Sequence, residues 1–125
     1  MKKGNTIRIG VIGVGHLGNF HVKQLKEISG ISISGIYDKN PIRADEISNQ
    51  YDVKSFSSLQ KLLKISDAVS IVTPTSYHFE IANLALENGC HIFIEKPITD
   101  KIEHAGLLLN KAEKLNKTIQ VGHIE

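Results

Sequence analysis

The feature that most constrains the fold is a regular alternation along the chain. Short apolar runs rich in β-branched residues are each followed by a longer segment whose apolar residues have helical spacing. Strands that alternate with helices are typical of a parallel sheet with right-handed crossovers, and strands buried on both faces are nearly continuous apolar runs. We therefore expect an α/β fold with a doubly wound parallel sheet. The predicted strands are residues 7–14, 31–37, 68–72, 91–94 and 118–122, and the predicted helices are 17–28, 41–50, 58–64, 76–88 and one after residue 100.

Particular residues predict where the helices begin and end. Asn40 before Pro41 is typical of an N-cap followed by the first helical position, and Gly30 is a natural stop for the first helix. Asp100 is expected to cap the last helix, and Val53 to start a minor strand. The expected apolar positions of the last helix are Ile102, Leu107, Leu108 and Leu115.

Length and charge exclude several classes of protein. A chain of 125 residues is about one domain, and neither a repeat nor a linker divides it, so residues 1–125 are expected to form one unit. The net charge of +2 is spread along the chain, which argues against binding to nucleic acid or to an anionic membrane. No apolar stretch approaches the ~18 residues needed to span a bilayer. The single Cys90 fits a soluble protein of the reducing cytoplasm.

A glycine-rich segment follows the first predicted strand. Residues 13–18 read G-x-G-x-x-G and lie where a helix should begin. In that context the first glycine allows a tight turn, the second lets the backbone approach a pyrophosphate, and the third lets helix and strand pack closely. Free amides at the helix start would hold the phosphates, and a ligand-free turn is the alternative. The residues expected to bind the coenzyme here are Gly13, Gly15, His16, Leu17 and Gly18.

An acid follows at the distance that such a turn requires. Asp38 lies twenty residues after Gly18, at the end of the second predicted strand, where a carboxylate can accept hydrogen bonds from ribose hydroxyls. Its charge disfavours a 2′-phosphate, so we expect NAD to be preferred over NADP. Lys39 and Arg43 are close enough in sequence to soften that preference, which leaves NADP open. A solvated turn residue is the alternative interpretation of Asp38.

Three further segments complete a recognisable set. They are Thr73-Pro74-Thr75 with His78, then Glu95-Lys96-Pro97, and finally Gly122-His123. With the glycine turn, and in this order, they resemble the Gfo/Idh/MocA oxidoreductases over almost the whole chain. The resemblance implies a Rossmann domain that binds a nicotinamide coenzyme, and a second α/β domain that supplies most of the substrate pocket. Members of this family oxidise or reduce hydroxyl groups of sugars, inositols and related polyols.

The resemblance also implies roles for individual residues. Thr73 and Pro74 would lie against the coenzyme, with His78 at the start of the next helix, and Glu95 would contact the nicotinamide side. Lys96 would be the catalytic lysine of the family. Hydride transfer itself also favours such a group, because an ammonium near the carbinol oxygen stabilises the negative charge that develops on that oxygen as the hydride leaves. An exposed loop lysine is the alternative.

The remaining histidines suggest no further chemistry. We expect His21 and His104 to be solvent-facing helix positions, His123 to be structural, and no metal to bind, since no His/Cys/Asp/Glu cluster has ligand spacing.

The family's second domain is absent from these residues. The chain is therefore expected to bind NAD but to turn over little alone. A free-standing NAD-binding regulatory module, or a CoA- or nucleotide-binding domain unrelated to redox chemistry, is the alternative. The substrate is not determined by these residues, and exposed apolar surface on the open face leaves a homo-oligomer possible.

Overall fold

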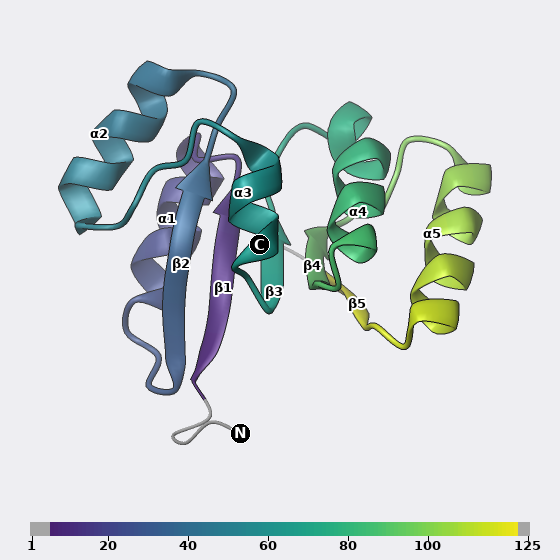
Figure 1. Ribbon diagram of the computed structural model, residues 1–125. Coiled ribbons are helices and arrows are strands. Elements are labelled where there is room, and N and C mark those ends of the chain that lie inside the picture. Colours follow the sequence, from purple (N-terminus) through teal and green to yellow (C-terminus); the bar gives the residue numbers. More distant parts are fainter. Residues whose placement is uncertain (1–5, 123–125) are drawn as a thin grey trace.

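The computed structural model describes residues 6–122 and is built on one five-stranded sheet (Figure 1). The strand order is β2-β1-β3-β4-β5, and every neighbouring pair is parallel. This confirms the predicted α/β class and the doubly wound sheet. The strands are β1 (Ile7–Ile12), β2 (Ile31–Tyr37), β3 (Ala68–Ile71), β4 (His91–Glu95) and β5 (Ile119–Gly122).

Helices cover both faces of the sheet, and each face has its own apolar core. In Figure 1, α1 lies behind the sheet while α3 and α4 lie in front. The core on the α1 side contains Val11, Val22 and Ile47, and the core on the α4 side contains Ile71, Ile94 and Leu108. Among residues 6–122, no helix is long and apolar enough to cross a membrane. The helices are α1 (His16–Leu25), α2 (Pro41–Tyr51), α3 (Leu59–Lys64), the 3₁₀ turn η1 (Thr75–Tyr77), α4 (His78–Glu87) and α5 (Ile102–Leu115).

The strand order creates a switch point at the centre of the sheet. The chain passes from β1 to β2 on one side, and then returns to place β3 on the other side of β1. The loops that leave the carboxyl ends of β1 and β3 therefore diverge to opposite faces. In open α/β sheets, ligands bind in the crevice outside this edge.

Two of the predicted helix starts are confirmed in detail. The side chain of Asn40 accepts hydrogen bonds from the N–H groups of Ile42 and Arg43, and Pro41 is the first residue of α2. The hydroxyl of Ser58 caps α3 in the same way. Asx and serine side chains thus satisfy amides that the first helical turn leaves unpaired.

Three predictions about local structure were wrong. The N-cap of α5 is Lys101 rather than Asp100, and no side chain caps that helix. Of the four apolar positions predicted for this helix, Leu108 is buried, whereas Ile102 is 89% exposed and Leu107 and Leu115 are also exposed. The minor strand expected at Val53 is reduced to a single bridge between Ser55 and Ile36.

Candidate functional site at the carboxyl edge of the sheet

The glycine turn connects β1 to α1 at the switch point. Gly13 has φ of +94°, and its N–H donates to the carbonyl oxygen of Tyr37 over 2.8 Å. A Cβ on Gly18 would lie 1.9 Å from the carbonyl oxygen of Gly13, so only glycine fits there. A Cβ on Gly15 would meet nothing within 4 Å, because that residue faces open space. The first helical hydrogen bond runs from Asn19 N–H to Gly15, which leaves the amides of the preceding turn without helical partners.

Asp38 and Arg43 hold this turn from the second βα unit. The Asp38 carboxylate accepts hydrogen bonds from the N–H of Val14 over 2.8 Å and from the N–H of Asn40 over 2.8 Å. From α2, the Arg43 guanidinium donates to the carbonyl oxygens of Val14 and Gly15 over 2.8 and 3.4 Å. The shape of the turn is therefore fixed by side chains more than twenty residues away in the sequence.

A pocket of about 210 Å³ opens beside the turn. On one side Lys39 contacts Tyr77, with its ammonium 2.8 Å from the phenol oxygen and 4.3 Å from the ring centroid. This hydrogen bond raises the pKa of Lys39 above its ordinary value. The hydroxyl of Thr73 is buried and has no hydrogen-bond partner among residues 6–122, so the wall of the pocket contains an unsatisfied polar group. The predicted site residues that line this pocket are Gly13, Gly15, Asp38, Thr73 and Pro74.

His78 joins the two loops that follow β3 and β4. Its side chain is buried, at 1% exposure. One ring nitrogen lies 3.0 Å from the carbonyl oxygen of Thr73, and the other lies 3.1 Å from the carbonyl oxygens of both Pro97 and Ile98. His78 thus lies outside the pocket lining and instead fixes the Thr73 loop to the segment that follows Lys96.

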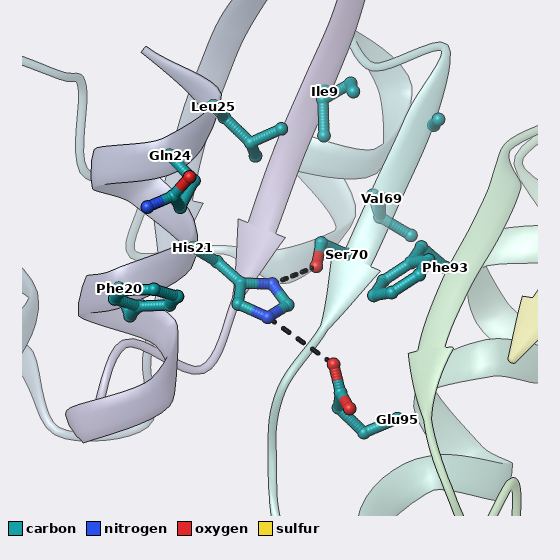
Figure 2. Close-up of a pocket in the computed structure, with 10 residues that line it drawn as sticks. Ile9, Phe20, His21, Gln24, Leu25, Val69, Ser70, Phe93 and Glu95 are labelled. Atoms are coloured by element: carbon teal, nitrogen blue, oxygen red, sulfur yellow. Dashed lines mark hydrogen bonds and ion pairs between the residues drawn. The ribbon is translucent and has the colours of Figure 1, made fainter. Parts of the chain in front are cut away.

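The ends of β4 and β5 place the two remaining candidates. Lys96 is exposed just beyond β4, and its N–H donates to the carbonyl oxygen of Gly122 over 3.0 Å. Glu95 points to the α1 side of the sheet, where it lines a second and larger cavity of about 510 Å³ (Figure 2). We call this cavity the α1-side groove; its lining includes Ile9, Phe20, Leu25, Val69 and Phe93. His123 lies outside the described residues.

The α1-side groove contains a polar cluster that the sequence did not reveal. His21 was expected to face solvent, but its ring nitrogens lie 2.9 Å from the Ser70 hydroxyl and 3.4 Å from a Glu95 carboxylate oxygen (Figure 2). The expectation failed because β3 and β4, which are remote in sequence, lie against α1. The sequence did contain one signal. His21 lies three residues after Gly18 and four before Leu25, a spacing that places all three on one helix face. His104, also expected to face solvent, is half-buried and stacks on Phe79 with ring centroids 4.0 Å apart.

Burial of His21 should make the stability of the fold sensitive to acid. Desolvation lowers the pKa of His21 below its ordinary value of 6.5, an effect that the charge of Glu95 opposes. The unfolded chain therefore takes up this proton at a higher pH than the folded chain, so stability falls as the pH drops through about 6.5. We expect the urea midpoint to decrease from about pH 7.5 to about pH 5, and to decrease less in His21→Gln. An equal decrease in both proteins would contradict this.

The described residues give no indication of a metal centre. No group of three or more His, Cys, Asp or Glu side chains within residues 6–122 could hold a metal ion.

The candidate site is made of backbone amides, Asp38, Thr73 and Pro74 around one pocket, with Glu95 and Lys96 at the end of the neighbouring strand.

Comparison with known proteins identifies relatives of this chain. The chain is 44% identical over 119 residues to a UDP-N-acetylglucosamine 3-dehydrogenase of Acidithiobacillus ferrooxidans, and 33% identical over 122 residues to a scyllo-inositol 2-dehydrogenase (NAD(+)) of Bacillus subtilis. These matches cover 95% and 94% of this chain but only 37% and 36% of the two relatives. The chain thus spans little more than a third of their length.

Solved structures agree with the sequence relatives. The structure of the Acidithiobacillus enzyme matches with a TM-score of 0.90 at 42% identity, covering 94% of this chain and 38% of that one. A scyllo-inositol dehydrogenase from Lactobacillus casei with bound NAD(H) and scyllo-inositol matches with a TM-score of 0.86 at 29% identity, covering 94% and 36%. The model of the GFO/IDH/MocA oxidoreductase family, NAD-binding Rossmann fold, matches residues 7–123. The chain therefore belongs to the Gfo/Idh/MocA oxidoreductase family and has the NAD-binding Rossmann fold of that family.

Proposed function

We propose that this chain is the coenzyme-binding part of an NAD-dependent dehydrogenase that acts on a hydroxyl group of a sugar, inositol or related polyol. The observation that carries the proposal is the glycine turn at the switch point, beside a pocket that contains Asp38 and the unpartnered Thr73 hydroxyl. The names of the relatives support the substrate class, since they include sugar-nucleotide and inositol dehydrogenases. Residues outside the matched third of such proteins would complete the substrate pocket.

The turn suits a pyrophosphate for three physical reasons. Its amides at the start of α1 have no helical partners, and the helix dipole places about half a positive charge there. The open space beside Gly15 lets a ligand reach the backbone. The Arg43 guanidinium, although its hydrogen bonds go to turn carbonyls, adds positive charge to the same region. We assign pyrophosphate binding to the backbone of Gly13, Gly15, His16, Leu17 and Gly18.

Asp38 is proposed to bind the adenosine ribose. Each of its carboxylate oxygens already accepts one backbone N–H, and each retains capacity for a second hydrogen bond from a ribose hydroxyl. Thr73 and Pro74 form the opposite wall of the pocket, and the contact between Lys39 and Tyr77 borders it. His78 supports this wall from behind through the Thr73 carbonyl.

Lys96 is proposed as the catalytic residue. NAD supplies the hydride acceptor at the edge of the sheet when it is bound. An ammonium at the carboxyl end of β4 could hydrogen-bond the substrate oxygen and stabilise the negative charge that it gains. Glu95, the last residue of β4, would lie on the nicotinamide side. Hydride transfer also requires the substrate to be held in position, so we expect little turnover from these residues alone.

A buried thiol supports a cytoplasmic location. Cys90 is free and buried, and burial raises the pKa of its thiol. Its Sγ lies 3.4 Å from the carbonyl oxygen of Leu63, within the core of the α4 side. A structural thiol of this kind requires no oxidising compartment.

The direct test is calorimetric titration of the purified chain with NADH. We expect saturable heat, and a gain in stability of about 2.7 kcal/mol at a ligand concentration 100 times the dissociation constant. CoA and ADP serve as control ligands. Absence of both heat and stabilisation with NADH would overturn the proposed function, and tighter binding of CoA would support the alternative outside redox chemistry.

Asp38 should also select NAD over NADP. A carboxylate about 4 Å from a 2′-phosphate would weaken NADP binding by about fivefold to several hundredfold, depending on the effective dielectric constant. Asp38→Asn removes that charge. The dissociation constant for NADP divided by that for NAD should therefore fall at least about fivefold. Asp52→Asn is a matched control, because Asp52 lies exposed at the far end of α2 in a left-handed conformation that Asn tolerates. An unchanged ratio in Asp38→Asn would show that another group makes the selection.

A further inference from the structure

Three side chains from three different elements meet in the α1-side groove. His21 projects from α1, Ser70 from β3 and Glu95 from the end of β4 (Figure 2). The imidazole Nδ1 lies 2.9 Å from the Ser70 hydroxyl, and the Nε2 lies 3.4 Å from a Glu95 carboxylate oxygen. The side chains of His21 and Glu95 are only 14% and 13% exposed. The imidazole thus connects the helix of the glycine turn to the residue before Lys96.

The surroundings of this pair are mainly apolar. Phe20 and Leu25 from α1 and Phe93 from β4 line the groove, with the Phe93 ring centroid 6.0 Å from that of His21. Such walls lower the local dielectric constant and strengthen charge interactions. The buried oxygen of Glu95 makes no hydrogen bond among the described residues, and its 3.4 Å contact with the His21 Nε2 is an ion pair only when the imidazole is protonated.

The ionisable groups around the imidazole are few. Within the described residues of the groove lining, α1 contributes the neutral Gln24 and β3 the neutral Ser70, and β4 contributes Glu95 as the ionisable group that faces the ring. The next charged residue along the chain is Lys96, which is exposed beyond the strand. The charge state of His21 therefore decides whether the Glu95 carboxylate is compensated.

We propose that His21 is a positioning residue that holds Glu95 at the nicotinamide end of the site and, by gaining or losing a proton, sets the net charge there. This inference rests on the proposed function, in which the coenzyme binds along the carboxyl edge of the sheet. Ser70 suits the role because a hydroxyl can donate to or accept from the imidazole. The ring can then change charge while it keeps its orientation.

The charge of the pair should distinguish the two redox forms of the coenzyme. The nicotinamide ring of NAD⁺ carries a positive charge, and that of NADH does not. With a neutral imidazole the pair carries one negative charge and favours NAD⁺, whereas with an imidazolium the pair is neutral. For unit charges roughly 7 Å apart, Coulomb's law gives a factor of about three to fifty in relative affinity, for effective dielectric constants between about 80 and about 20.

The experiment compares the affinities of the purified chain for NAD⁺ and NADH at about pH 8 and about pH 5, an acid limit well below the ordinary histidine pKa because burial lowers the pKa of His21. In the wild-type protein, the affinity for NAD⁺ relative to NADH should fall at least about threefold on acidification. In His21→Gln this relative affinity should not change between the two pH values. In Glu95→Gln it should already be low at about pH 8, and any further fall should need a lower pH, because the charge of Glu95 no longer favours protonation of the imidazole. His91→Gln is the matched control, because His91 is exposed at the opposite end of β4 and should leave the wild-type response unchanged.

Each outcome bears on one of the two proposals. A wild-type pH response in His21→Gln, or a wild-type relative affinity at about pH 8 in Glu95→Gln, would overturn the role of His21 while leaving coenzyme binding intact. If the wild-type chain bound neither form, the proposed function would fail, and this inference with it. Should His21→Gln not fold, Glu95→Gln still provides the decisive comparison at about pH 8, because it removes the carboxylate whose charge is proposed to favour NAD⁺.

Discussion

Gly18→Ala is expected to abolish coenzyme binding and to destabilise the fold by about 3 kcal/mol, the upper part of the usual range for forcing an atom into a packed site. The added Cβ would lie 1.9 Å from the carbonyl oxygen of Gly13, and backbone cannot move aside as a flexible side chain can. Either α1 would shift away from β1 or the turn would open, and both changes displace the amides proposed to hold the pyrophosphate. Urea unfolding and titration with NADH measure the two effects.

Two other glycines provide controls for this variant. Gly106→Ala lies within α5 with nothing within 4 Å of the new atom, so helix propensity should make it stabilising by about 0.5 to 1 kcal/mol. Gly15→Ala also meets open space and should fold normally, but its methyl group would occupy the approach of the pyrophosphate and weaken NADH binding. Wild-type binding and stability in Gly18→Ala would show that the turn can adapt, contrary to its geometry.

His78→Leu should be the most destabilising of the histidine substitutions. It leaves the carbonyl oxygens of Thr73, Pro97 and Ile98 without the ring that faces them, in a place where the original side chain is only 1% exposed. Leaving buried polar groups unpaired costs about 1 to 3 kcal/mol each, and some can find new partners, so we expect a loss of about 2 to 4 kcal/mol in unfolding free energy. Chemical denaturation at neutral pH provides the measurement.

The location of His78 predicts a functional effect as well. The ring fixes the Thr73 loop to the segment after Lys96, so its loss should also weaken NADH binding. His78→Gln, which retains a hydrogen-bond donor, should recover part of the stability. His91→Leu removes only one exposed hydrogen bond, which the ring accepts from the Thr118 N–H, and should change stability by about 1 kcal/mol or less. A His78→Leu protein as stable as the wild type would show that the three carbonyl groups find other partners.

Elements with strong local signals were predictable from the sequence. The boundaries of β2 were predicted to the residue, and α2 differs by one residue at its end, because Asn40 and Pro41 specify its start chemically. The last helix was placed correctly although its cap was not, since an apolar repeat identifies a helix better than it identifies the first residue. The strand before the glycine turn was predicted two residues too long, because Gly13 already leaves the sheet with positive φ.

Features that depend on distant contacts were not predictable in this way. One error was local instead: the first helix was predicted to continue to residue 28, but α1 ends at Leu25, after which Glu27 N–H and Ile28 N–H donate to carbonyl groups three residues earlier. Asp38 was identified from its distance to the glycine turn, yet its hydrogen bond to Val14 N–H follows only from the pairing of β1 with β2. The His21 cluster depends on how α1, β3 and β4 pack together, and a single sequence gives little information about such packing.

The double role of Asp38 has a consequence for anyone who wishes to convert the coenzyme preference. The carboxylate that would repel a 2′-phosphate is also a structural acceptor for Val14 N–H and Asn40 N–H. Replacing Asp38 therefore removes hydrogen bonds that fix the glycine turn, together with the charge that would exclude NADP. Introducing a second cation beside Lys39, or adding a replacement acceptor for the Val14 N–H, is the safer engineering route, because it changes the ligand preference without loosening the loop that binds the ligand.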